Sequence, residues 1–234
     1  MIIVLNNKSN MDKYEFLDYQ EKIGTLDTNS KIILCPTYLN INLCHLRRVS
    51  LGAQNVSPYE EGAFTGEVSA KELKASGVKY CIVGHSERRE HQKETDEEIH
   101  EKIRRLLDND MKPILCVGET KEERERGEVN QVLTKELEIA TKDLTDREKA
   151  RLIIAYEPVW SIGTGLIPTL DEIDEVISMI KTQFPYTRVL YGGSANEENI
   201  DMLKQSSWID GYLVGGLSIK PQELQVFINK LENK

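Results

Sequence analysis

A carboxylate stands directly after an apolar run in this chain, and the residues that follow it could form a loop that closes. Residues 152–156 are apolar, and Glu157, Pro158, Gly163 and Gly165 come after them. A base at the end of a strand, beneath a loop that can close, is what proton abstraction in a water-excluded cavity requires. The alternative is a buried strand followed by a proline turn and a glycine turn, without chemistry.

Glu157 is the candidate general base, and its neighbours could strengthen it. A carboxylate is a weak base in water, and it becomes a stronger one where apolar groups keep water away. Ile162 and Leu213 could supply that apolar surround. A solvated glutamate at a strand end is the alternative interpretation.

His85 is a candidate electrophile. Ser86, Glu87 and Arg88 follow it and would begin a helix, whose dipole disfavours a charged imidazolium at the N-terminus. A neutral imidazole can donate a hydrogen bond to a carbonyl oxygen and so stabilise a developing enolate. The alternative is a histidine that caps the helix or fills the core.

Lys8 would place a cation at the end of the first strand, where it could bind a substrate anion and stabilise an oxyanion. Asn6 lies two residues earlier and would point to the same face. Glu87 could pair with Lys8 and orient it, although Arg88 and Arg89 are rival partners. Taken alone, a lysine at a strand end is more often simply solvated.

Two glycine pairs could bring backbone close to a bound anion. Gly192 and Gly193 follow one apolar run, and Gly215 and Gly216 follow another. Ser194 and Gly216 would open short helices whose N–H groups face a phosphate. Turns also use glycine pairs freely, so either pair alone is weak evidence.

Eight short apolar runs recur along the chain, and charged segments with helical periodicity separate most of them. Strands that alternate with helices form parallel sheets, because parallel neighbours need a crossover connection. Eight such units predict an α/β fold with a closed (β/α)8 barrel, in which chemistry gathers at the carboxyl ends of the strands. An open, doubly wound sheet is the alternative, and the lack of a GxGxxG motif weakens its dinucleotide-binding version. The runs are residues 2–5, 31–35, 49–53, 79–83, 113–117, 152–156, 188–191 and 211–214.

Composition argues against several classes of protein. The chain has 234 residues and a formal net charge of −9, which suits one large α/β domain and disfavours nucleic-acid binding. Its four cysteines lack zinc-ligand spacing, so we expect reduced thiols, no metal and a cytoplasmic protein. No apolar run is long enough to span a membrane. The mixed-charge segment 119–128 predicts a solvated helix face.

These segments, in this order, resemble the triosephosphate isomerase family over nearly the whole chain. The resemblance implies a single-domain (β/α)8 TIM barrel over residues 1–234. It also implies an intramolecular aldose–ketose isomerase that interconverts dihydroxyacetone phosphate and D-glyceraldehyde 3-phosphate in glycolysis and gluconeogenesis, without cofactor or metal. The strongest stretches are residues 62–67, 84–89, 116–119, 155–165, 191–194 and 211–216.

The resemblance also implies roles for the site residues, following the mechanism established for the family. Glu157 would move a proton between adjacent carbons through an enediolate, and neutral His85 would be the electrophile. Lys8 and Asn6 would complete the oxyanion site. Residues 158–167 would form the lid. The main-chain N–H groups that would hold the phosphate belong to Gly163, Ser194, Gly215 and Gly216.

The same resemblance implies a homodimer, with a tetramer as the alternative. Residues 54–65 are similar to a loop that interdigitates with the partner subunit, and Thr65 would reach towards the partner's active site. Glu67 and Arg88 resemble an ion pair between subunits.

The chain departs from the family pattern at two positions that bear on the site. Asn7 stands where the family usually has tryptophan, so an aromatic group that helps to fix the lysine loop is absent. Pro168 has no N–H, so no hydrogen bond can form between its nitrogen and the Tyr191 hydroxyl. Segments 9–53 and 166–190 are also short for the family. Two alternatives therefore stay open: a barrel of this ancestry that binds ligand without much catalysis, and another sugar-phosphate isomerase.

Overall fold

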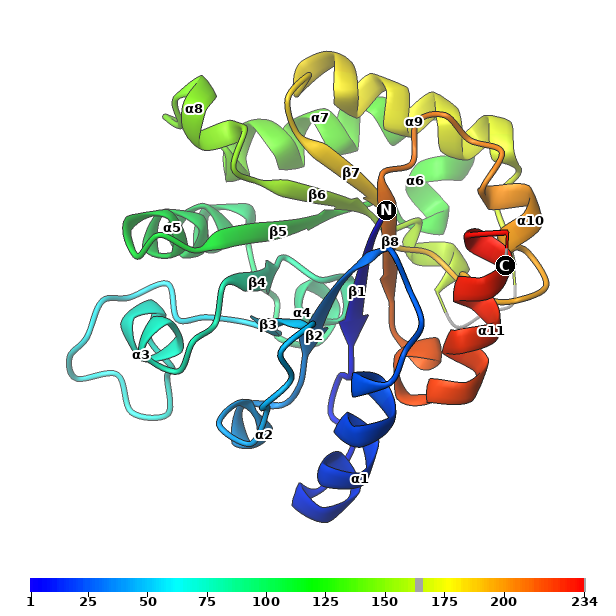
Figure 1. Ribbon diagram of the computed structural model, residues 1–234. Coiled ribbons are helices and arrows are strands. Elements are labelled where there is room, and N and C mark those ends of the chain that lie inside the picture. The colour runs from blue at the N-terminus through cyan, green and yellow to red at the C-terminus, as the bar shows by residue number, and fades with distance from the viewer. Residues whose placement is uncertain (163–165, 234) are drawn as a thin grey trace.

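A closed parallel barrel forms the centre of the molecule. The structure is a computed structural model and describes residues 1–162 and 166–233. Within this described part, eight parallel strands pair in sequence order, and β1 also pairs with β8 to close the barrel (Figure 1). The predicted (β/α)8 fold is therefore confirmed, and each predicted strand end lies within one residue of the observed one. The strands are β1 Ile2–Asn6, β2 Lys31–Cys35, β3 Ser50–Ala53, β4 Tyr80–Val83, β5 Lys112–Val117, β6 Ile153–Tyr156, β7 Arg188–Tyr191 and β8 Gly211–Val214.

Side chains along each strand alternate between the barrel interior and the surrounding helices. In β1, Val4 belongs to the interior cluster, whereas Ile3 and Leu5 belong to the larger cluster between strands and helices. This period of two continues to the strand ends. Asn6 follows Val4 by two positions, and Glu157 follows the interior residue Ala155 by two, so both side chains face the mouth of the barrel.

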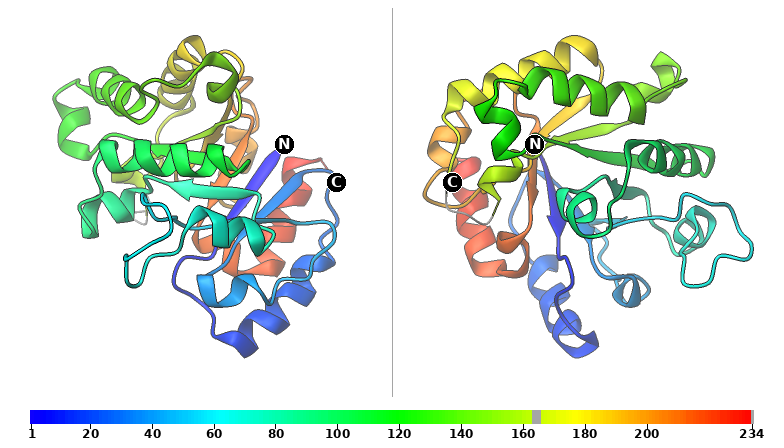
Figure 2. Two further views of the ribbon diagram at one scale, coloured as in Figure 1. Left: turned by 90° about the vertical axis from the view of Figure 1, so that its left-hand side faces the viewer. Right: turned by 180° about the vertical axis from the view of Figure 1, so that it is seen from behind.

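Helices surround the barrel, and each of the long ones turns an apolar face towards the strands (Figure 2). The predicted inward face of α9 is confirmed, because Ile173, Val176, Ile177 and Ile180 are all buried. None of the described helices is long and apolar enough to cross a membrane. The α-helices are α1 Lys13–Gly24, α2 Tyr38–Ile41, α3 Ala70–Ala75, α4 Ser86–His91, α5 Asp96–Asp108, α6 Lys121–Glu125, α7 Val129–Ala140, α8 Asp146–Lys149, α9 Leu170–Gln183, α10 Ile200–Leu203 and α11 Pro221–Leu231, and the 3-10 helices are η1 Val159–Ser161 and η2 Gly216–Ile219.

Capping boxes set the starting points of many of these helices. In each box, the N-cap side chain accepts a hydrogen bond from the backbone N–H three residues later. The glutamate at that later position accepts a hydrogen bond from the backbone N–H of the N-cap residue. Losing such a cap costs about 1 kcal/mol, so these local signals fix where the chain turns from loop to helix. The N-cap residues of the boxes are Asp12, Ser69, Thr95, Thr120, Thr145 and Thr169.

One connection leaves the compact outline of the barrel. Residues 54–69, between β3 and α3, extend outward in Figure 1 and in both views of Figure 2. Tyr59 and Phe64 stack on this loop with ring centroids 4.1 Å apart. Both rings stay substantially exposed, at 50% and 40%. The loop is thus ordered by an aromatic contact of its own while it presents apolar surface to its surroundings.

Candidate active site

The predicted residues meet in a cavity of about 380 Å³ at the carboxyl ends of the strands. Loops after β1, β4, β6, β7 and β8 line it, as expected for a barrel of this kind. Among the described residues, no group of three His, Cys, Asp or Glu side chains could hold a metal ion. The predicted residues that line the cavity are Asn6, Lys8, His85, Glu157, Ile162, Ser194, Leu213, Gly215 and Gly216.

Glu157 and His85 face each other across this cavity. Glu157 Oε1 lies 3.2 Å from His85 Nε2, and the glutamate side chain is only 2% exposed. The N–H of Ser86 donates to Glu157 Oε2 at 2.9 Å, which places the carboxylate against the first turn of α4. A nearly dry carboxylate held by a backbone hydrogen bond is preorganised to take up a proton from carbon.

The hydrogen bonds of His85 define its tautomer. The N–H of Glu87 donates to His85 Nδ1 at 3.2 Å, so this ring nitrogen caps α4 and carries no proton. The proton of a neutral ring is then on Nε2, the nitrogen that faces Glu157 and the cavity. His85 therefore combines the capping role with the geometry of a hydrogen-bond donor to a substrate oxygen.

Lys8 enters the cavity on a constrained backbone. Its φ of 51° is in the left-handed region, and its N–H donates to Asn6 Oδ1 at 3.1 Å. Gln54 donates to the Lys8 carbonyl at 2.8 Å from the other side. Nζ pairs with Glu87 Oε1 at 2.5 Å, as predicted. Partial burial raises the pKa of Glu87, but the hydrogen bond from Lys8 and the charge of Lys8 lower that pKa by more, so the carboxylate stays charged beside Lys8.

The turn after β8 approaches Lys8 closely. A Cβ atom on Gly215 would lie 2.8 Å from Lys8 Cε, so the lysine chain would have to shift to admit a larger residue there. Gly216 opens η2, as predicted. The expectation that Ser194 opens a helix is wrong, because α10 begins at Ile200 and Ser194 lies in the loop before it. Gly163 lies outside the described residues.

An apolar floor lies beneath the carboxylate of Glu157. Leu213 is 3% exposed inside the barrel, and Ile162 is half-buried at the rim. A Cβ atom on Gly192 would come within 2.9 Å of Glu157 Cγ, so this glycine leaves room for the base. Burial and the charge of Glu157 raise the pKa of the Cys116 thiol, which therefore stays protonated beside the carboxylate.

Three residues assigned by resemblance to contacts between subunits lie apart from this cavity. Thr65 and Glu67 are exposed on the β3–α3 connection, and Thr65 is not among the described residues that line the cavity. Arg88 is occupied within its own chain, where its Nε donates to Glu94 Oε2 at 3.0 Å.

Sequence patterns missed Glu119. Its segment predicts a solvated helix face, and that is wrong for this residue, because Glu119 is fully buried. Its Oε1 accepts hydrogen bonds from Trp160 Nε1 at 2.7 Å, Arg124 at 2.9 Å and Tyr156 at 3.2 Å. Its position just past the apolar run 113–117 is the signal that marks it as a strand-end residue.

Both departures from the family pattern are visible in the structure. Asn7 is completely buried and bonds to polar groups. Pro168 is buried, and the Tyr191 hydroxyl, also buried, has no hydrogen-bond partner among the described residues. Pro168 has no N–H that could donate to this hydroxyl.

Comparisons with known proteins match the geometry. A family model described as triosephosphate isomerase matches residues 1–231. A protein named triosephosphate isomerase from Mesomycoplasma hyopneumoniae (strain 7448) is 41% identical over 216 residues, which cover 90% of this chain and 88% of the relative. One from Gloeothece citriformis (strain PCC 7424) is 38% identical over 239 residues, covering 97% and 98%. One from Aspergillus oryzae (strain ATCC 42149 / RIB 40) is 38% identical over 220 residues, covering 88% of each. A match over nearly the whole chain, with the strand-end residues gathered in one cavity, shows that this protein belongs to the triosephosphate isomerase family.

Proposed function

We propose that the chain interconverts dihydroxyacetone phosphate and D-glyceraldehyde 3-phosphate. The observation that carries this proposal is the pair formed by Glu157 and His85, 3.2 Å apart and facing Lys8 in one buried cavity. A base, a neutral donor and a cation around one small volume suit the abstraction of a proton next to a carbonyl. The reaction serves glycolysis and gluconeogenesis in this family.

The chemistry needs only protons to move. Glu157 removes a proton from the carbon beside the carbonyl, and the electron pair moves onto the carbonyl oxygen to give an enediolate. His85 Nε2–H, Lys8 Nζ and the Asn6 amide stabilise the negative oxygen. His85 Nε2 gives its proton to this oxygen and takes the hydroxyl proton from the neighbouring oxygen, which moves the proton between the two. Glu157 then returns its proton to the other carbon. No oxidant or reductant is required.

The phosphate of the substrate binds to backbone at the opposite wall of the cavity. Main-chain N–H groups of Ser194, Gly215 and Gly216 would hold it, and Gly163 would join them from the lid. Lys8 adds charge on the same side, because its Cε lies against Gly215. Phosphate and reacting carbons would thus be fixed by different walls, which orients the substrate.

We also propose a homodimer, with the tetramer as the alternative. The stacked rings of Tyr59 and Phe64 and the side chain of Leu39, 90% exposed, offer apolar surface that suits a subunit contact. Thr65 lies on the same loop and would reach the partner subunit. Phe64→Asp should shift the mass in solution from dimer to monomer in sedimentation. A wild type that is monomeric at micromolar concentration would overturn this proposal.

The remaining assignments complete the proposal. We propose that residues 1–234 form one catalytic barrel domain, and that the protein works in the cytoplasm. The proposed cytoplasmic location is supported by the four cysteines, none of which is in a disulfide among the described residues. Limited proteolysis should leave one core that retains all activity.

A coupled assay with glyceraldehyde 3-phosphate tests the central proposal. Wild type should turn over rapidly, and Glu157→Gln should lose turnover by about 10³-fold or more, because the amide cannot accept the proton. Inorganic phosphate should still inhibit or bind the variant. Wild-type protein that binds phosphate without turnover would instead favour a binding protein. Activity only on another sugar phosphate would favour a different isomerase.

A further inference from the structure

We propose that Asn7 is a positioning residue that holds Lys8 against the turn at Gly215, acting through a buried hydrogen-bond network with Tyr19 and Ser218. The inference rests on the proposed function, because it assigns to Asn7 the alignment of the cation that serves both the oxyanion and the phosphate. Asn7 itself does not line the cavity.

The amide of Asn7 joins two elements that are far apart in sequence. Its Nδ2 donates to the Tyr19 hydroxyl on α1 at 3.1 Å and to Ser218 Oγ on η2 at 3.3 Å. All three side chains are buried, with exposures of 0% for Asn7, 4% for Tyr19 and 0% for Ser218. Each amide proton therefore has its own acceptor in a site without water competition.

Two further bonds close the network into a loop. The Tyr19 hydroxyl donates to the Ser218 carbonyl at 2.7 Å, and Ser218 Oγ donates to the Asn6 carbonyl at 2.9 Å. Each of the two hydroxyls thus accepts a hydrogen bond from Asn7 and donates one to a backbone carbonyl oxygen. Burial raises the pKa of Tyr19 well above its ordinary value, so the hydroxyl keeps its proton. The backbone at Asn6 and the backbone of η2 become one unit.

Lys8 is the residue directly affected by this unit. It follows Asn7 immediately, and its left-handed φ of 51° strains a side chain with a Cβ atom. Its Cε would meet a Cβ atom on Gly215 at 2.8 Å, and Gly215 itself begins the turn that Ser218 ends, because Ser218 N–H donates to the Gly215 carbonyl at 2.8 Å. Both ends of the Lys8–Gly215 contact are therefore tied to the same buried amide.

Stability alone does not account for this asparagine. Asn7 Oδ1 is buried and has no hydrogen-bond partner among the described residues. A buried unsatisfied oxygen is costly, and an apolar residue of similar size would avoid that cost. The two directed donor bonds are what the amide adds, because an apolar side chain could form neither and the single N–H of an indole could form only one.

A double-mutant cycle between Asn7→Ala and Lys8→Ala tests the proposal. With Lys8 present, Asn7→Ala should lower kcat/KM and the affinity for inorganic phosphate by about tenfold each. In the Lys8→Ala background the same substitution should change either quantity by less than about twofold, since the group that it positions is gone. Kinetics and titration calorimetry with inorganic phosphate give the two readouts.

Tyr19→Phe serves as the second variant, because it deletes one hydroxyl and keeps the ring if Asn7→Ala fails to fold. It should show a smaller loss that also disappears in the Lys8→Ala background. Thr187→Val is the matched control: Thr187 is buried, donates to the Lys149 carbonyl at 3.0 Å and precedes β7 at the other end of the barrel. It should leave both quantities unchanged.

Additive effects in the cycle would overturn the proposal and leave Asn7 a purely structural residue. An unaltered phosphate affinity in both Asn7→Ala and Tyr19→Phe would overturn it as well. Failure of the proposed function gives a different pattern: wild type would not turn over the triose phosphate, while the calorimetric cycle on phosphate would still measure the link between Asn7 and Lys8.

Discussion

The carboxylate of Glu119 accepts a hydrogen bond from the indole of Trp160 at 2.7 Å and so fastens η1, the turn after Glu157, to the end of β5. The Arg124 guanidinium lies 5.0 Å from the centre of the same indole ring. The Val159 N–H also donates to the Glu119 carbonyl at 3.1 Å. The chain that follows Glu157 is therefore anchored by the side chain and the backbone of one buried residue.

Trp160→Phe removes the indole N–H and keeps an aromatic ring, so it tests this anchor. We expect kcat to fall about fivefold, because one net hydrogen bond of about 1 kcal/mol no longer steadies the segment after the base. Steady-state kinetics measures the change. The other tryptophan, Trp208, is 41% exposed and provides the control, since Trp208→Phe should keep the wild-type kcat. Equal kcat values for both variants would exclude a catalytic consequence of the anchor.

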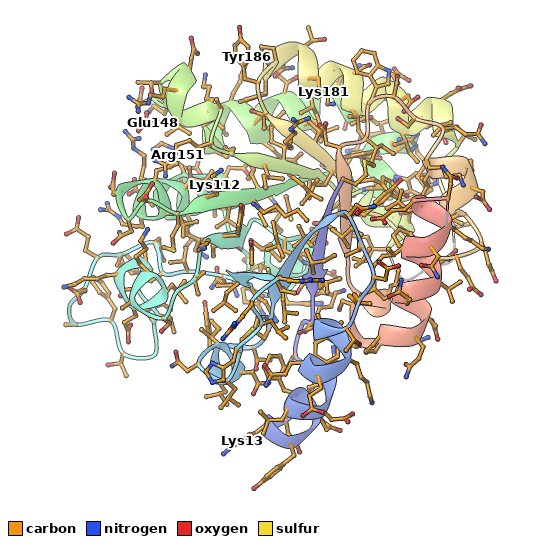
Figure 3. The ribbon with its side chains drawn as sticks, in the orientation of Figure 1. Lys13, Lys112, Glu148, Arg151, Lys181 and Tyr186 are labelled. Carbon is orange, nitrogen blue, oxygen red and sulfur yellow. The ribbon has the colours of Figure 1, made fainter. Side chains whose placement is uncertain are left out.

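Lys8→Ala should lower kcat/KM by about 10³-fold, because in the proposed mechanism the cavity loses the cation that stabilises both the oxyanion and the phosphate. Lys112→Ala is the charge-matched control. Lys112 is exposed at the start of β5 (Figure 3), whereas the site lies at the carboxyl ends of the strands. Full activity in Lys8→Ala would remove the lysine from the site.

The same variant should change the titration of Glu87. The hydrogen bond from Lys8 lowers the pKa of this carboxyl, so its removal should raise that pKa. Carboxyl chemical shifts followed by NMR across the acid range would measure the change. A pKa that stays where it is in wild type would mean that Lys8 does not hold Glu87 in its charged form.

Periodicity and strand ends predicted most of the fold and most of the site. Eight short apolar runs defined the strands. Parallel strands place their carboxyl ends at one end of the barrel, so Glu157, His85 and Lys8 were expected to lie close together there. Local capping signals, such as Thr169 with its glutamate partner, set where the helices begin. These features depend on neighbours in sequence, which is why a single sequence reveals them.

Contacts between distant segments could not be predicted in this way. Glu119 lies among charged residues, and only the fold shows that it is buried against Trp160, 41 positions away. From the sequence, Asn7 was only a position that lacks the usual aromatic ring. Its hydrogen bond to Ser218, 211 positions away, becomes visible only in the fold. Ser194 was expected to open a helix because a glycine pair precedes it, yet the helix starts later. A local pattern carries no information about which distant polar group will supply a partner.

Glu136 should make stability depend on pH. Its Oε2 accepts from the Gly118 N–H at 2.9 Å, and burial raises its pKa from the ordinary 4.5 to about 7, although Arg89 acts to lower it. Between these two values the folded state binds the proton and the unfolded state does not, so stability falls as pH rises from 4.5 to about 7. The loss across this window is about 3 kcal/mol at most.

Glu136→Gln should flatten that dependence, because the amide does not titrate. Urea unfolding through the pH window measures it. Glu148→Gln is the control, because the hydrogen bonds of Thr145 lower the pKa of this half-buried carboxylate, seen at the edge of the molecule in Figure 3. That variant should keep the wild-type decline. A decline of the same slope in Glu136→Gln would assign the pH dependence to another group.

Gly118→Ala should both destabilise the fold and displace the Glu157 carboxylate. A Cβ atom at this position would lie 1.7 Å from the Glu157 carbonyl oxygen and 2.6 Å from its carbonyl carbon, so β5 and β6 must separate to admit it. Overpacking against backbone costs about 3 kcal/mol, because backbone cannot rotate away as a side chain can. The Glu157 N–H donates to the Val117 carbonyl at 2.8 Å, next to the affected residue, so the shift should reach the Glu157 carboxylate and lower kcat.

Gly216→Ala is the control for unfolding, since a Cβ atom there would have no other atom within 4 Å. The melting temperature of Gly118→Ala should therefore be well below that of the wild type, and the melting temperature of Gly216→Ala should equal that of the wild type. A Gly118→Ala protein that melts with the wild type would show that β5 and β6 can move apart at little cost, and the tight seat of Glu157 would then not depend on this glycine.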